Sequence, residues 1–221
     1  MEHFFKIYNS QMKKIFALCC CLFLTSCFEI TERIKYHDDQ SGEYTLMVDF
    51  SKSWLKTKSA IWLEEVDGVK IPNEQEITQK LADFKSKVSK IEGISNITTK
   101  TDFDSYIFII KLDYQSLKAL NEVVNTLNKQ KNQIHFNGNT KSFERIASYP
   151  IPENLLKDEK KKEDLEKANI ISIYTFDHDI LATSNANSKI SKNKKTVFLK
   201  QSMYNVLKKS SLMNNNIQLN P

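Results

Sequence analysis

One short segment near the start of the chain limits how the rest of it can fold. Lys13 and Lys14 precede an apolar run from Ile15 to Thr25, and Cys27 follows that run closely. A helix needs about 20 apolar residues to cross a membrane, so this run is too short for a permanent span. A basic pair followed by a short apolar run is typical of a secretory signal. The folded part is therefore expected as a single globular domain over residues 27–221.

The residues that end the apolar run indicate how the signal is processed. Leu24-Thr25-Ser26-Cys27 resembles the bacterial lipobox, in which a leucine and two small residues precede a lipid-modified cysteine. The resemblance implies that residues 1–26 are a signal peptide and that Cys27 becomes the lipidated N-terminus, with the membrane as its partner. Two or three acyl chains hold a protein firmly on a membrane, whereas one holds it marginally. Met12, directly before the lysine pair, is an alternative to Met1 as the start of translation.

The cysteines and the charges describe the remaining domain. All four cysteines lie in or at the end of the leader, so the exported domain has no disulfide and depends on its core. A domain of about 195 residues buries roughly 70% of its unfolded surface, which is sufficient. After Asp179 the chain has seven lysines and no acidic residue. This basic C-terminal third either makes weak contact with anionic surfaces or simply carries lysine at solvated positions.

The hydrophobic pattern predicts an α+β domain, in which an antiparallel sheet of hairpins packs against two or three helices. Two hairpins are expected over 28–50 and 94–112. Asn73 and Glu76 form a capping-box pattern at the start of a helix that ends near Gly93, and another helix is expected over 117–127. The segment 51–72 has a mixed pattern, which indicates a short helix or an irregular stretch.

The second half of the chain is expected to contain shorter elements. A turn at Asn137-Gly138 is predicted to join strands 134–136 and 143–146. A helix predicted over 153–168 intersperses five lysines with six acidic residues, which indicates a solvated helix and no nucleic-acid partner. The remaining predicted elements are strands over 170–176, 181–184 and 196–200 and a helix over 201–207. The tail 213–221 is expected to be frayed.

Few residues of the domain suggest chemistry. His37-Asp38-Asp39 and Asp177-His178-Asp179 place His beside Asp, but a metal site needs three or more converging ligands, and Asp at strand ends also favours turns. The four glycines are isolated and there is no Gly-x-Ser-x-Gly, so the pattern predicts neither a phosphate loop nor a nucleophile elbow. We therefore assign no catalytic, cofactor-binding or metal-binding residue, and Cys27 is the predicted lipidation site.

Several turn and strand segments carry a resemblance that spans most of the chain. They are the lipobox and residues 39–44, 67–72, 93–97, 104–108 and 184–191. Together they resemble a group of uncharacterised Bacteroidetes lipoproteins with no assigned activity. The resemblance implies a cell-envelope location, with the outer membrane favoured. Surface export in that phylum goes with acidic residues clustered after the lipid cysteine, and residues 28–32 lack such a cluster, so a periplasm-facing anchor is favoured over surface exposure.

Two classes of function remain open at this level. The first is a membrane-anchored envelope lipoprotein with a non-catalytic binding or structural domain. The second is a hydrolase-like envelope enzyme whose site is assembled from residues scattered along the chain. The missing motifs favour the first class. A deep pocket that holds a His together with carboxylates or a Ser would favour the enzyme.

Overall fold

The computed structural model describes residues 28–66, 69–149 and 159–221, whose strands form two sheets and a short two-stranded ribbon. Seven strands make the large sheet in the order β11-β12-β9-β1-β2-β6-β5, and four make the small sheet in the order β10-β13-β8-β7. The strand bounds are β1 Glu29–Tyr36, β2 Gly42–Asp49, β3 Glu65–Val66, β4 Val69–Lys70, β5 Ile94–Asp102, β6 Ile107–Tyr114, β7 Phe136–Asn139, β8 Ser142–Arg145, β9 Asn169–Phe176, β10 Asp179–Thr183, β11 Lys189–Ile190, β12 Thr196–Ser202 and β13 Asn215–Asn220.

The large sheet is mixed, because β1 pairs antiparallel with β2 on one side and parallel with β9 on the other. Both predicted hairpins of the first half, β1–β2 and β5–β6, are present. The parallel pair joins segments from opposite halves of the chain, from Glu29 with Asn169 to Tyr36 with Phe176. The α+β class therefore holds, but the predicted antiparallel sheet of hairpins is wrong. The alternation of apolar and polar residues indicates which face of a strand is buried. It does not indicate whether a distant partner strand runs parallel or antiparallel to it.

The small sheet corrects two further predictions. The β7–β8 turn lies at residues 139–142 and not at Asn137-Gly138, and Asn139 Oδ1 closes it by accepting bonds from Lys141 N at 2.8 Å and Ser142 N at 3.1 Å. The tail predicted to be frayed forms β13, which lies between β8 and β10. Its alternating residues Ile217 and Leu219 are buried in the core, which is why this end of the chain is ordered.

The helices follow the sequence signals more closely. α3 (Glu74–Val88) begins at the predicted capping box, in which Asn73 Oδ1 accepts from Glu76 N at 2.9 Å and Glu76 Oε2 accepts from Asn73 N at 3.1 Å. α4 (Leu117–Asn128) is the second predicted helix, and α2 (Trp54–Leu63) occupies the segment of mixed pattern. α5 (Glu159–Lys167) and α6 (Met203–Lys208) agree with the last two predicted helices, although part of the predicted 153–168 helix lies outside the described residues.

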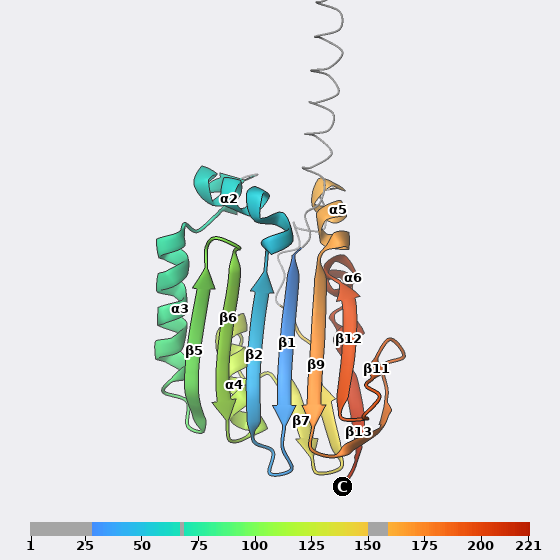
Figure 1. Ribbon diagram of the computed structural model, residues 1–221. Coiled ribbons are helices and arrows are strands. Elements are labelled where there is room, and N and C mark those ends of the chain that lie inside the picture. Colours follow the sequence, from blue (N-terminus) through green and yellow to red (C-terminus); the bar gives the residue numbers. More distant parts are fainter. Residues whose placement is uncertain (1–27, 67–68, 150–158) are drawn as a thin grey trace, which may run out of the picture.

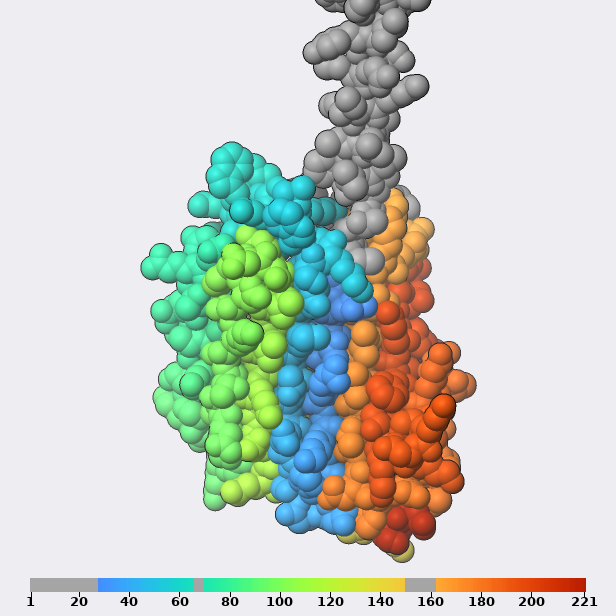
Figure 2. Space-filling model, viewed as in Figure 1, coloured from blue at the N-terminus to red at the C-terminus, as the bar shows by residue number. Residues whose placement is uncertain are grey.

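Only one face of the large sheet is covered by described elements. α4 and the small sheet lie behind it in Figure 1, whereas Figure 2 shows the strands themselves on the front face. The main core fills the space between the two layers and includes Tyr44, Leu112, Phe143 and Tyr174. α2 and α5 stand at one end of the sheet, where β1 begins and β2 ends (Figure 1). The covered face and this end are therefore the places to examine for function.

Candidate functional site

Cys27 lies outside the described residues, and the chain is held in the sheet from the next residue onward. Phe28 O accepts a hydrogen bond from Asn169 N at 3.0 Å, and the Phe28 ring centroid lies 5.2 Å from that of Phe50. Phe28, the residue that follows Cys27 in the sequence, is therefore fixed at the end of the sheet where α2 stands (Figure 1).

A cavity of ≈ 470 Å³ lies between the large sheet and the elements that cover it, and we call it the interlayer cavity. β1, β2 and β9 line one side, and α4 and α6 line the other. Strand residues two positions apart share a face, which is why several inward-facing residues of β1 and β2 line the cavity side by side. The aliphatic walls include Ile30, Leu46, Val48, Leu127, Met203 and Leu207. A few polar groups in a mainly apolar cavity of this size are typical of a ligand pocket.

The polar part of this cavity is a buried ion pair between Glu32 of β1 and Arg145 of β8. Arg145 Nε donates to Glu32 Oε1 at 3.0 Å and Nη2 donates to Oε2 at 3.1 Å, a bidentate arrangement. Arg145 Nη1 donates to the carbonyl of Ile146 at 2.8 Å, and Tyr174 Oη donates to Glu32 Oε1 at 2.5 Å. Both charges are thus compensated by groups of the domain itself, and the pair forms part of the inner wall of the cavity.

Burial shifts the pKa values of the groups around this pair. Burial alone would lower the pKa of Arg145, but the charge of Glu32 opposes this effect and holds that pKa above its usual value. Burial also raises the pKa of Tyr149, which lines the cavity, to about 12. His135 is fully buried, and burial together with the charge of Arg145 lowers its pKa to about 4. In this cluster burial therefore disfavours the ionised form of Tyr149 and the protonated form of His135.

The sequence analysis missed the interlayer cavity and its ion pair. Two signals were present, because Glu32 lies between the inward-facing Ile30 and Ile34 of an alternating strand, and Arg145 follows the inward-facing Phe143 in the same way. A charged residue at an inward position indicates a buried partner. The identity of that partner depends on how β1 and β8 meet across the two layers, which no local pattern contains.

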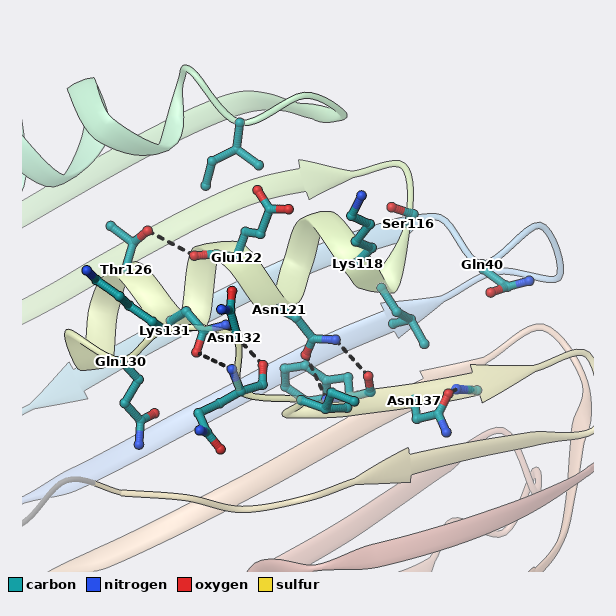
Figure 3. Close-up of a pocket in the computed structure, with 17 residues that line it drawn as sticks. Gln40, Ser116, Lys118, Asn121, Glu122, Thr126, Gln130, Lys131, Asn132 and Asn137 are labelled. Atoms are coloured by element: carbon teal, nitrogen blue, oxygen red, sulfur yellow. Dashed lines mark hydrogen bonds between the residues drawn. The ribbon is translucent and has the colours of Figure 1, made fainter.

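A second concavity, of ≈ 800 Å³, runs along α4 and the loop that follows it (Figure 3). Asn121 Oδ1 accepts from the backbone N–H groups of His135 at 2.9 Å and Phe136 at 2.8 Å, and Asn121 Nδ2 donates to Phe136 O at 2.9 Å. Asn125 Nδ2 donates to Gln133 O at 3.0 Å. The side-chain amides of Asn121 and Asn125 form hydrogen bonds with the backbone of the loop, as a neighbouring strand would. These amide groups therefore stabilise the fold. We assign this groove a structural role.

The two His–Asp motifs meet at the ends of the parallel strands β1 and β9. His37 Nδ1 lies 2.8 Å from Asp177 Oδ2, and His178 Nε2 lies 2.9 Å from Asp38 Oδ1. Each histidine is thus matched with a single carboxylate of the other motif. Within residues 28–66, 69–149 and 159–221 no group of three or more His, Cys, Asp or Glu side chains converges as metal ligands would. The motifs link two adjacent loops by crossed His–Asp contacts.

The lining of the two concavities bears on the choice between binding and catalysis. The described lining of the interlayer cavity contains Glu32 but no His or Ser, because Ser172, the cross-strand partner of Glu32, and His135 are buried and do not line it. The described lining of the α4 groove contains Ser116 and Glu122 but no His. A nucleophile needs a base within hydrogen-bond reach. The arrangement of the described residues is suited to holding an apolar molecule.

Comparisons with known proteins relate this chain to others only distantly. No protein-family model matches it, and no curated protein matches its sequence. Among solved structures, it is similar to the NMR structure of the folded domain of the Mycobacterium tuberculosis protein LppM, with a TM-score of 0.45 and 9% identity over 87% of this chain and 88% of that one. This likeness is too weak to establish a shared fold. The resemblance to Bacteroidetes lipoproteins receives no support from the three comparisons.

Proposed function

We propose that this protein is a lipid-anchored envelope protein that binds an apolar ligand, of the alkyl-chain class, in its interlayer cavity. The observation that carries the proposal is the cavity itself, whose walls are mainly aliphatic and whose two buried charges, Glu32 and Arg145, compensate each other. An alkyl chain needs contact with apolar walls and no hydrogen bonds, so its binding leaves the buried ion pair intact. The proposed role is binding without chemical conversion.

The anchor in this proposal is a lipid on Cys27, supported by the lipobox resemblance and by the position of Phe28, the next residue, at the end of the sheet. No helix in the described parts of the chain has the length and apolar character required to cross a membrane. We propose attachment to the outer membrane with the domain facing the periplasm, since residues 28–32 carry no acidic cluster. Contact of the basic C-terminal third with anionic surfaces stays a prediction.

The cavity is tested by titration of 11-(dansylamino)undecanoic acid, a fluorescent fatty acid, against a chain of residues 28–221, which contains every described element. Val48 lines the cavity, and Val48→Phe fills part of it. Loss of space for roughly two methylenes, at about 0.8 kcal/mol each, is expected to weaken binding about tenfold. The matched control is Thr45→Phe, which places the same side chain on the opposite face of β2.

Cooperative unfolding of each variant in urea shows whether it is folded. Saturable binding by the unsubstituted chain, weakened by Val48→Phe and unchanged by Thr45→Phe, supports the proposal. Absence of saturable binding, or equal affinity in the two variants, would contradict it.

A further inference from the structure

Exposed apolar side chains are concentrated on α2. Trp54, Leu55, Trp62 and Leu63 are 48, 47, 81 and 57% exposed, and the helix buries none of its side chains. They account for half of the strongly exposed large apolar residues in the described part of the chain. Exposed apolar residues that occur singly need no explanation, whereas four on one short helix mark an interaction surface.

Lysine accompanies these apolar residues and acidic residues are missing. The segment 51–63 contains Lys52, Lys56 and Lys58 and no Asp or Glu. Lys52 pairs with Glu29 at 3.4 Å and Lys56 pairs with Asp164, so two of the three lysines also hold the helix segment to the body of the domain. Trp, Leu and Lys are residue types that helices bound in the membrane interface also carry.

The opposite side of α2 faces the domain. Thr57, Ala60 and Ile61 line a small apolar concavity whose other wall contains Phe28 and Phe50. The helix therefore has an inner side that packs against the first described residue and an outer side that carries both tryptophans. Figure 2 shows α2 protruding at the end of the molecule where β1 begins. This outer side thus lies at the end of the domain where Phe28, the residue after Cys27, is held (Figure 2).

We propose that α2 is a membrane-docking element, whose outer side inserts Trp54, Leu55, Trp62 and Leu63 into the headgroup region of the bilayer that holds the Cys27 anchor. The orientation rests on the proposed anchor, whereas the composition of α2 is an independent observation. Tryptophan prefers the interface because its ring is apolar and its N–H remains hydrated. With α2 docked, the strands of the large sheet run away from the membrane surface. The end of the sheet opposite α2, which carries the crossed His–Asp pairs, then lies away from the membrane.

The two tryptophans make the proposal directly testable, because the protein has no others. The full chain is purified from membranes and reconstituted in vesicles of phosphatidylethanolamine and phosphatidylglycerol, with or without brominated acyl chains. Interfacial helices insert about 5–10 Å, so we expect the bromines to reduce tryptophan emission by roughly half or more. Trp54→Phe and Trp62→Phe each leave one reporter, and both variants are expected to show quenching.

The matched control moves the reporter to the far end of the molecule. In a chain with Trp54→Phe and Trp62→Phe, Leu181→Trp places a tryptophan at a 60% exposed position on β10, beyond the eight residues of β9. At about 3.3 Å per residue, β9 alone separates the two ends by roughly 26 Å, so no quenching is expected there. Equal quenching at both ends would overturn the proposal.

Flotation of the same vesicles reports the anchor separately. A chain that floats and whose α2 tryptophans are quenched supports docking. A chain that floats without quenching keeps its anchor and overturns docking. Iodide, a quencher dissolved in the water, then tells whether the tryptophans are exposed. Tryptophans that iodide cannot reach are covered by another protein or by a second copy of the chain, which overturns docking as well. A chain that does not float has lost the anchor, and the docking proposal falls with it. None of these three results changes the fatty-acid titration of the cavity, so the two proposals fail independently.

Discussion

Single residues in this protein matter where two elements approach each other closely. Gly42 lies between Tyr36 of β1 and Tyr114 of β6, and a Cβ on it would come within 1.8 Å of the carbonyl oxygen of Lys35. The Tyr114 hydroxyl group lies next to Gly42 and donates a hydrogen bond to the carbonyl oxygen of Lys35 at 3.1 Å. Glu32 and Arg145 are a second case, because each charge is tolerated in the interior only in the presence of the other.

We expect Glu32→Gln to destabilise the domain strongly, because it leaves the buried charge of Arg145 without a counter-ion. Removal of one partner of a buried pair costs about 3–5 kcal/mol in free energy of unfolding. Urea denaturation measures the loss. Glu29→Gln is the matched control on the same strand, since Glu29 pairs with Lys52 at 3.4 Å and Lys200 at 3.3 Å near the surface. That substitution is expected to cost at most about 1 kcal/mol, and similar losses in the two variants would show that burial of the pair is unimportant.

At the scale of elements, short-range signals determine helices, and the pairing of distant segments determines strands. The capping box at Asn73 defines the start of α3 without reference to the rest of the fold. β13 is different, because its residues pair with β8 on one side and β10 on the other. An isolated strand has unpaired N–H and C=O groups on both edges, so β13 exists only because these neighbours exist.

Removal of β13 is therefore expected to prevent cooperative folding. A chain that ends at Met213 loses the inner strand of the small sheet together with the buried Ile217 and Leu219. Ile217→Ala tests the same element more mildly and is expected to reduce the free energy of unfolding by about 2–5 kcal/mol. Circular dichroism during urea unfolding reads out both. A Gln218→Ala variant at an exposed position of β13 is the control, and a truncated chain as stable as the full one would contradict the assignment.

At the scale of the whole molecule, three features lie in different parts of the fold. The end where β1 begins carries α2, the interlayer cavity lies between the sheet and its covering elements, and the front face of the sheet is free of described helices (Figure 1). The front face carries Glu43, which lies 2.8 Å from Lys111 and 3.6 Å from Lys35. The hydrogen bond from Lys111 holds the pKa of Glu43 below its usual value, as expected for a solvated face stabilised by ion pairs.

We expect mass spectrometry of membrane fractions to find the mature N-terminal peptide beginning at a lipidated Cys27. Protease treatment of intact cells should leave the protein uncut, because the proposed anchor faces the periplasm. Cys27→Ser is the control and should lose the lipid and, with it, the firm attachment that acyl chains give. An unmodified Cys27 would overturn the anchor, and a lipidated protein that protease removes from intact cells would place the domain on the surface.

The sequence by itself determined the elements that depend on neighbouring residues. These are α3 with its cap, α4, the two hairpins of the first half and the α+β class. The tertiary structure alone decided that β1 lies parallel to β9, that β13 is an inner strand, and that Glu32 meets Arg145 beside an apolar cavity. The physical reason is range, since a helix closes its hydrogen bonds within four residues, whereas a strand takes its partners from any part of the chain.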